Sequence, residues 1–417
     1  MTHLELRDAL SVLAGLRSDA EPILTLYLDT HWADEKKREL ARVFLQDASK
    51  RAIDRHAAHP QLEALRRMLG RVEAEAADRV RNSGAEVERG LAVFACEALG
   101  LWRVLESPRP FRNELCVDGR PHLLQLARVA GDVEPALMAS VHAKGIRVYE
   151  MALGAIVSET SIEGVTPGKH AEGASRRAGP SPSPHGPSGG ASFEREQKDQ
   201  RHLEEQVQRV WREAAAHFTA LFDRDPRQNV VLVGTATTVA DFERLLPERM
   251  RERVRVRLPR PPGKASWRGN GKNDLVQQAA AKLRELERAS EAVSVERAIG
   301  EAMRGGLAVL GPEDVVLAVN ERRVHRLILE EDFAGSGWRC RNCGALGTTH
   351  DERCSFCQGP LARVDALGEE LLGRVLTEDG DVEVVAHTNR LHSYAGVAAL
   401  LRQARARGLS GRDIRSQ

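Results

Sequence analysis

Residues 188–195 read Ser188-Gly189-Gly190-Ala191-Ser192-Phe193-Glu194-Arg195, and they stand directly before a long helical pattern. From Phe193 to Phe222, apolar side chains recur at helical spacing, which predicts an amphipathic helix with Ser192 as a suitable N-cap residue. Two glycines before a helix are typical of either a functional loop or a flexible connector. A phosphate-binding loop is excluded, because no GxxxxGK[ST] spacing follows a strand here.

The segments around this stretch predict a central α/β domain over residues 133–273. Its expected strands lie at 136–141, 146–151, 155–162 and 230–234, and its expected helices at 193–222 and 239–250. Between the third strand and the long helix, residues 167–192 form a loop rich in Gly, Pro and Ser. Such a composition cannot bury enough apolar surface to order itself.

The chain on either side of this domain also predicts α/β structure, in an N-terminal domain (1–132) and a C-terminal domain (274–417). In the N-terminal domain we expect helices at 4–16 and within 34–81, and strands at 22–29, 91–96 and 101–105. In the C-terminal domain we expect helices at 274–290, 295–303, 367–376 and 397–407, and strands at 314–319 and 382–386. The expected fold class is therefore α/β in three domains.

Composition and charge exclude several classes of protein. The 417 residues are 42% apolar and 29% charged, which is typical of soluble globular structure rather than disorder. The 61 basic and 60 acidic side chains nearly cancel, so net charge indicates no partner. No apolar run reaches the ~18–20 residues of a membrane helix, and the first residues lack the pattern of a signal peptide. We expect a cytoplasmic monomer with no membrane partner.

Positive charge does gather locally, between residues 249 and 272. Within this stretch Arg253, Arg255 and Arg257 alternate with apolar residues, which predicts an edge strand with an arginine face. Arginine side chains on such a face suit RNA phosphates, whose neutralisation releases counterions. The alternative is a solvated edge strand whose charges only prevent aggregation.

Two CxxC pairs stand ten residues apart, and their members are Cys340, Cys343, Cys354 and Cys357. Two residues between thiolates allow one turn to present both sulfurs to one ion, and four thiolates suit tetrahedral Zn²⁺. The spacing therefore predicts a structural Zn²⁺ site in an insertion over residues 338–360. A disulfide or redox pair is the less favoured alternative in a cytosolic chain. The other cysteines, Cys96 and Cys116, are expected to be core thiols.

Three features together resemble the archaeo-eukaryotic peptide release factor 1 and Pelota family, and most of all its bacterial branch, which includes ribosome hibernation factors. They are the Gly-Gly segment before a long helix, the CxxC pairs of the third domain, and the ending Tyr394-Ala395-Gly396-Val397-Ala398-Ala399-Leu400-Leu401-Arg402. Release factors carry Gly-Gly-Gln-Ser before a helix that begins Phe-x-Arg, and residues 189–195 are similar. The resemblance implies the three-domain release-factor architecture with a zinc-knuckle insertion in the third domain.

Two departures from the release-factor pattern bear on activity. The release-factor Gln helps to position water on the peptidyl-tRNA ester, whereas Ala191 offers no side-chain hydrogen bond. Gln197 and Gln200 lie too far along the helix to replace it. We therefore expect no catalytic residue. The Asn-Ile-Lys-Ser motif of stop-codon readers is also missing from domain 1, so stop-codon decoding is not expected.

The resemblance implies a ribosome-binding factor that occupies the A site without codon reading, in ribosome hibernation or stalled-ribosome rescue. The segment Gly189-Gly190-Ala191-Ser192 would reach the peptidyl transferase centre, and the body would contact 23S and 16S rRNA. A translational GTPase such as elongation factor Tu is the implied protein partner. The side chains expected to contact RNA are Arg176, Arg177, Arg195, Arg201, Arg253, Arg255, Arg257, Arg260, Lys264 and Arg268.

Two other functions stay open at this point. The first is a peptidyl-tRNA hydrolase or release-type rescue factor, in which the backbone N–H groups of Gly189 and Gly190 act with a ribosomal 2′-hydroxyl. The second is a non-ribosomal RNA-binding scaffold that reuses the fold.

Overall fold

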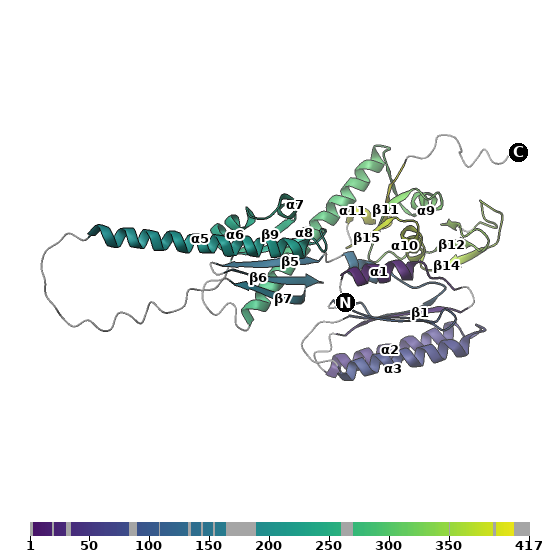
Figure 1. Cartoon of the computed structure of the whole chain (residues 1–417). Coiled ribbons are helices and arrows are strands. Elements are labelled where there is room, and N and C mark those ends of the chain that lie inside the picture. The colour runs from purple at the N-terminus through teal and green to yellow at the C-terminus, as the bar shows by residue number, and fades with distance from the viewer. Residues whose placement is uncertain are drawn as a thin grey trace. The chain divides into compact units, whose positions relative to one another are not determined.

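The computed structural model (Figure 1) contains two compact units, each of mixed α/β structure, which confirms the predicted fold class. The composite unit joins Met1–Val133 to Arg284–Gln417, and the central unit is Glu134–Leu283. The structure describes residues 3–18, 21–30, 35–82, 90–107, 109–131, 135–142, 145–152, 155–163, 189–259, 270–349, 351–386 and 389–403. None of the helices in these ranges is long and apolar enough to cross a membrane. The predicted division into three domains stays a prediction.

The central unit is built on a five-stranded sheet with the order β7-β6-β5-β8-β9. Its strands are β5 (Ala136–His142), β6 (Gly145–Ala152), β7 (Ala155–Glu163), β8 (Asn229–Gly234) and β9 (Val254–Pro259). β5, β8 and β9 run parallel, so the chain must return across the sheet between them. The returning segments contain α5 (Gly189–Phe222), and then α6 (Ala236–Glu243) with α7 (Glu248–Arg251).

Helices cover both faces of this sheet, because successive residues of β5 point to opposite sides. Leu137 and Ala139 pack with Phe218 of α5 on one face. On the other face, Met138 packs with Leu275 of α8 (Asn270–Met303). The result is a three-layer arrangement in which the C-terminal half of α5 lies along the sheet (Figure 1).

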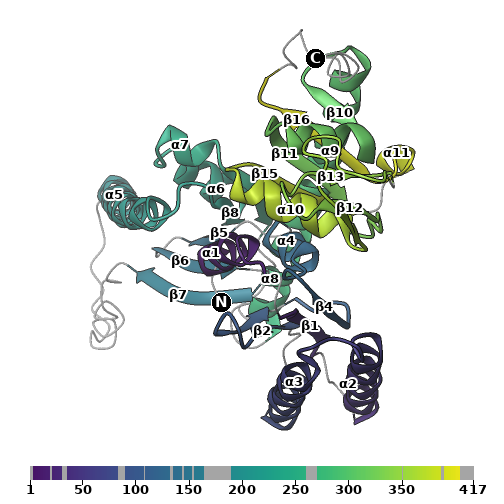
Figure 2. The ribbon, with the colours of Figure 1, turned by 90° about the vertical axis from the view of Figure 1, so that its right-hand side faces the viewer.

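The N-terminal segment of the composite unit folds as a four-stranded antiparallel sheet with the order β3-β2-β1-β4. Its strands are β1 (Ile23–Asp29), β2 (Gly90–Cys96), β3 (Leu101–Ser107) and β4 (Glu114–Asp118). The two predicted helices are confirmed as α2 (Glu35–Arg55) and α3 (Leu62–Asn82), which lie side by side on one face (Figure 2). They pack on Leu24, Leu26 and Leu28 of β1.

The C-terminal segment forms a second four-stranded sheet, with the order β10-β16-β11-β15. Its strands are β10 (Ala308–Leu310), β11 (Val324–Glu330), β15 (Asp381–Val385) and β16 (Val397–Leu401), and its helices are α9 (Pro312–Asn320), α10 (Leu367–Thr377) and α11 (Asn389–His392). The C-terminal half of α8 packs here through Val295 and Ile299. A separate small sheet, β13-β12-β14, carries the four clustered cysteines.

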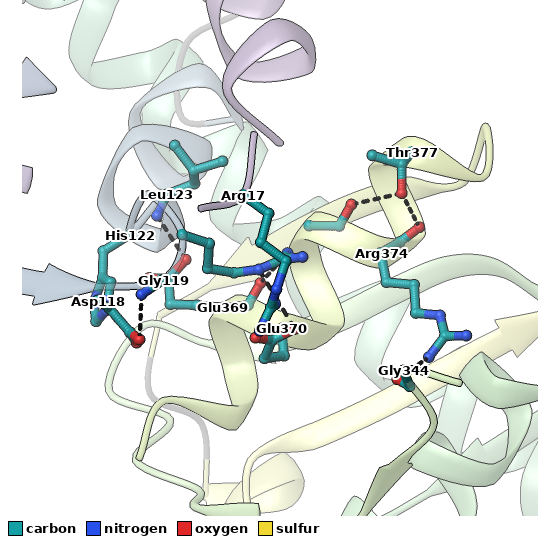
Figure 3. Close-up of polar contacts among 12 residues, drawn as sticks. Arg17, Asp118, Gly119, His122, Leu123, Gly344, Glu369, Glu370, Arg374 and Thr377 are labelled. Carbon is teal, nitrogen blue, oxygen red and sulfur yellow. Dashed lines mark hydrogen bonds and ion pairs between the residues drawn. The ribbon is translucent and has the colours of Figure 1, made fainter. Parts of the chain in front are cut away.

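The two segments of the composite unit meet where α1 (His3–Ala14) and α4 (Leu124–Gly131) pack against α10, with α4 also on β15. The buried carboxylate of Glu369 accepts the backbone N–H of Leu123 at 2.6 Å (Figure 3). It also accepts the backbone N–H of Leu124 at 3.0 Å. The first N–H groups of a helix have no partners inside the helix. A residue of α10 therefore caps the start of α4 by accepting these groups. The neighbouring Glu370 binds Arg17 at 2.8 Å.

A second set of charged contacts lies at the other end of α4. Arg128 donates to Glu291 of α8 at 2.9 Å and to the carbonyl oxygen of Val384 at 2.6 Å. Glu291 also accepts the backbone N–H of Ala386 at 3.2 Å. Arg128 and Glu291 thus each have hydrogen-bonded partners here, as burial of charge requires.

Two elements predicted for the C-terminal segment are wrong. Residues 314–319, predicted as a strand, belong to helix α9; Gly311 with φ 80° and Pro312 at the first helical positions favour a helix start there. Residues 397–407, predicted as a helix, begin with strand β16. This strand lies between β10 and β11, and pairing on both edges outweighs the helix propensity of its alanines.

Three helix boundaries also differ from the sequence expectations. The helices expected at 274–290 and 295–303 are one continuous helix, α8. The helix expected at 239–250 is divided into α6 and α7, with Pro247 as the N-cap of α7. α5 begins at Gly189 rather than Phe193, so the Gly-Gly-Ala-Ser segment is the first turn of the helix and not part of the preceding loop.

Replacement of the capping carboxylate tests the junction. Glu369→Ala leaves two buried N–H groups without an acceptor, so we expect the free energy of unfolding to fall by about 1–3 kcal/mol. Glu369→Gln keeps one acceptor oxygen and should lose less. Glu313, exposed in the first turn of α9, is the matched control, and its replacement by Ala should cost no more than about 0.5 kcal/mol. Urea unfolding followed by circular dichroism measures all three; equal losses for Glu369→Ala and Glu313→Ala would contradict the cap.

Candidate functional site

The four cysteines of the CxxC pairs converge in residues 337–364, which we call the cysteine ribbon. Its strands are β12 (Gly337–Cys340), β13 (Leu346–Gly347) and β14 (Leu361–Val364). The Sγ atoms of Cys340 and Cys357 lie 3.4 Å apart, those of Cys343 and Cys354 lie 3.6 Å apart, and all four lie within 4.8 Å of one another. Tetrahedral metal–sulfur bonds of ~2.3 Å place sulfurs about 3.8 Å apart, so the four cysteines fit one metal ion.

Backbone N–H groups point to two of the four sulfurs, those of Cys340 and Cys354. The N–H groups of Cys343 and Asn342 point to Cys340 Sγ at 3.5 and 3.4 Å, and that of Phe356 points to Cys354 Sγ at 3.4 Å. The N–H groups of Cys343 and Asn342, with that of Cys343 first, lower the pKa of Cys340 to about 6. Cys340 therefore favours the deprotonated form that a metal needs.

The residues after each CxxC pair permit the tight turns, as the sequence predicts. Gly344 has φ 74° and Gln358 has φ 61°, both in the left-handed region. Gly359 has a different reason to lack a side chain. A Cβ atom there would lie 2.8 Å from Asn342 Cβ and 3.1 Å from Cys340 Sγ, and both distances are shorter than normal van der Waals contacts.

Two residues that sequence analysis missed attach the ribbon to its unit. Asn320, at the end of α9, donates to the carbonyl oxygen of Leu346 at 2.8 Å and accepts the backbone N–H of Leu346 at 2.9 Å. Arg374 of α10 donates to the carbonyl oxygen of Gly344 at 3.0 Å (Figure 3). Both bonds cross between segments distant in sequence, so no local pattern could have indicated them. They hold the cysteine ribbon against α9 and α10.

The predicted arginine face is confirmed on β9, which is the edge strand of the central sheet. Arg255 and Arg257 are exposed, and the apolar residues between them are buried. Arg257 donates through Nε to Glu243 of α6 at 2.9 Å, a hydrogen bond that raises the pKa of Arg257. Arg253 is half-buried, with Nε 3.4 Å from the carbonyl oxygen of Gln228. Among the described residues, Arg255 alone of the three has no such partner.

The Gly-Gly-Ala-Ser segment lies at the far end of α5 from the part that packs on the sheet. Among the side chains that the structure describes on this helix, Trp211 is the first fully buried one, and it also donates to the carbonyl oxygen of His142 at 3.1 Å. Arg195 and Arg201 belong to the same helix, but their side chains lie outside the described residues. The other predicted RNA contacts outside the described residues are Arg176, Arg177, Arg260, Lys264 and Arg268.

The two remaining cysteines differ in their surroundings. Cys96 is 1% exposed in β2, which confirms it as a core thiol. Cys116 is only half-buried on β4, with Sγ 3.3 Å from a carboxylate oxygen of Glu114, so its prediction as a core thiol is wrong. The alternation of Glu114, Cys116 and Asp118 along one strand is the signal that could have indicated this polar setting.

The family comparison matches the segment that contains α5 and β9. Residues 121–293 match bacterial archaeo-eukaryotic release factor family 10. This match confirms the release-factor resemblance for the central part of the chain. The cysteine ribbon and residues 1–120 lie outside the matched range.

Solved structures of release-factor-like proteins resemble the chain at low identity. The crystal structure of the archaeal translation termination factor aRF1 is 16% identical over 97% of this chain and 99% of its own, with a TM-score of 0.24. Archaeoglobus fulgidus Pelota is 17% identical over 77% and 80% (TM-score 0.31), and S. cerevisiae Dom34 is 9% identical over 96% and 94% (TM-score 0.36). No curated protein matches the sequence.

Loss of one ribbon sulfur should lower the metal content. In Cys340→Ala, three thiolates remain, and we expect zinc analysis of the purified protein to give about one ion fewer per chain than in the unaltered protein. Limited proteolysis within residues 337–364 should become faster, because ligation contributes directly to the stability of such small folds. Cys96→Ala, which removes a buried thiol away from the ribbon, is the control and should leave both readouts unchanged. Equal zinc content in Cys340→Ala and the control would contradict a metal site in the ribbon.

Proposed function

We propose that this chain is a ribosome-binding translation factor that occupies the A site without codon reading, in ribosome hibernation or stalled-ribosome rescue in the cytoplasm. The observation that carries the proposal is the match of residues 121–293 to a bacterial release factor family, in a chain where Ala191 stands at the release-factor glutamine position. The expected partners are 23S and 16S rRNA and a translational GTPase such as elongation factor Tu. The expected ion of the cysteine ribbon is structural Zn²⁺.

The length of α5 supports the proposal. Trp211 stands 22 positions after Gly189, which corresponds to about 33 Å at 1.5 Å per helical residue. Figure 1 shows the N-terminal part of α5 extending past the end of the central sheet. A Gly-Gly-Ala end carried clear of the core of its own unit is slim enough to enter a narrow channel walled by RNA.

The chemistry of this end favours occlusion over catalysis. The side chain of Ala191 is a methyl group, which can neither orient water nor donate to a developing oxyanion. The segment would then exclude the acceptor end of a tRNA by filling its place, while the arginine face of β9 binds phosphates. Arg255 is the best placed of these arginines, because Arg257 is already paired with Glu243.

Restoration of the release-factor side chain tests whether the segment reaches the reaction centre. The natural protein should bind ribosomes that carry peptidyl-tRNA without releasing peptide, whereas Ala191→Gln should release it at a measurable rate. Ala191→Leu, similar in bulk but without an amide, is the matched control and should release nothing. Release by the natural protein that Gly190→Pro abolishes would instead support the hydrolase. Failure to co-sediment with ribosomes at ~50 mM salt, where phosphate contacts are strongest, would leave only the scaffold function.

Charge reversal at the exposed arginine tests the RNA-binding face. We expect Arg255→Glu to weaken ribosome binding by about 3- to 10-fold at low salt, and Arg255→Gln to reduce the salt dependence of log K by about 0.7–0.9, the contribution of one phosphate contact. Arg255→Lys keeps the charge and should retain most of the affinity. Co-sedimentation between ~50 and ~200 mM salt measures these effects. Unchanged affinity in Arg255→Glu would return β9 to the role of a solvated edge strand.

A further inference from the structure

A second group of metal-ligand side chains lies on β4, outside the cysteine ribbon. Glu114, Cys116 and Asp118 occupy alternate positions of this edge strand, so their side chains share one face. His122 follows in the turn before α4. One ligand atom each from Glu114, Cys116 and His122 lies within 4.8 Å of the other two, and all three residues are half-buried.

The position of His122 is fixed by the sheet. Its backbone N–H donates to Thr25 Oγ1 at 3.1 Å, and its carbonyl oxygen accepts the hydroxyl of Tyr27 at 2.8 Å. Thr25 pairs with Cys116 and Tyr27 with Glu114 in the register of β1 and β4. Residues directly opposite in such a pair share a face of the sheet. The histidine is therefore held over the face that carries Cys116 and Glu114.

Hydrogen bonds also orient the other side chains. Asp118 Oδ2 lies 3.3 Å from Nε2 of His122, an arrangement in which a carboxylate fixes the tautomer of an imidazole. Gln125 donates to one oxygen of Glu114 at 2.6 Å. The Cys116 thiol faces the other oxygen of Glu114 at 3.3 Å. Thiol, imidazole and carboxylate thus converge, with Asp118 behind the imidazole.

The charges around this group favour a cation. Glu114 lies in the same cluster as His122, and Asp118 Oδ2 lies 3.3 Å from the His122 Nε2. Glu369 of α10 acts on His122 as a further nearby carboxylate (Figure 3).

We propose that Glu114, Cys116 and His122 bind one divalent transition-metal ion of the zinc class, distinct from the ion of the cysteine ribbon. Mixed thiolate, imidazole and carboxylate donors are those that zinc accepts, and three protein ligands leave its fourth position to an exchangeable ligand. On binding, the Cys116 thiol releases its proton to solvent and the sulfur bonds to the ion. Asp118 is a positioning residue: its carboxylate holds the proton on Nε2 of His122, so that Nδ1 of the same imidazole carries the lone pair that binds the ion.

Metal stoichiometry of the full chain tests the site. Protein saturated with Zn²⁺ and freed of excess ion should hold two ions per chain, whereas Cys116→Ala and His122→Ala should each hold one. Cys96→Ala, which removes a free thiol from the same sheet, is the matched control and should hold two. One ion per chain in the natural protein, or two in both Cys116→Ala and His122→Ala, would overturn the proposal and leave a hydrogen-bonded network without a metal.

A second measurement covers the case in which these variants fold poorly. Asp118→Asn keeps all three ligands, and we expect it to weaken metal binding at this site by about 10- to 100-fold, as loss of an orienting carboxylate does. Co²⁺ added to protein whose ribbon already holds Zn²⁺ reports the affinity through its thiolate-to-cobalt absorption band. Absence of this band in the natural protein, or an unchanged affinity in Asp118→Asn, would count against the site. Ribosome binding enters neither experiment, so the outcome is independent of the proposed function.

Discussion

The packing of the C-terminal half of α5 on the central sheet is the constraint on which the functional interpretation depends. Phe218 is fully buried against β5, and Trp211 is tied by its indole N–H to the end of that strand. Because a helix is stiff over a few turns, fixing one half also directs the other half. The packing of Trp211 and Phe218 therefore helps to direct the Gly-Gly-Ala end, which begins the same helix about six to eight turns earlier.

The fold was predictable wherever a local pattern decided the structure. Helical spacing indicated α2, α3 and the packed part of α5, and strand alternation indicated the arginine face of β9. The cysteine ribbon was equally predictable, since the spacing within each CxxC pair determines the turn. Prediction failed for β16, whose sequence Val-Ala-Ala-Leu-Leu fits a helix as well as a strand. Its state is decided by the neighbours β10 and β11, which are distant in sequence.

The polar residues that organise the sites were harder to predict from the sequence than the metal ligands and the arginines themselves. Asn320 and Arg374 hold the cysteine ribbon, Glu243 pairs with Arg257, and Glu369 caps α4. Each acts on a partner outside its own element, so its role depends on tertiary contacts that no spacing rule describes. The residues that bear the proposed function are thus visible in the sequence, whereas those that orient them become visible only in the folded chain.

The bond between Glu369 and Leu123 joins residues 246 positions apart, and the central unit is inserted between them. During synthesis, the central unit is complete once residue 283 has been made, whereas the start of α4 has no cap until residue 369 follows. Bringing together two segments this far apart in sequence costs chain entropy, whereas the central unit is one contiguous segment. The central unit is therefore expected to fold first. The composite unit therefore finishes folding last, and a nascent chain stopped before α10 leaves α1 and α4 without their packing partner.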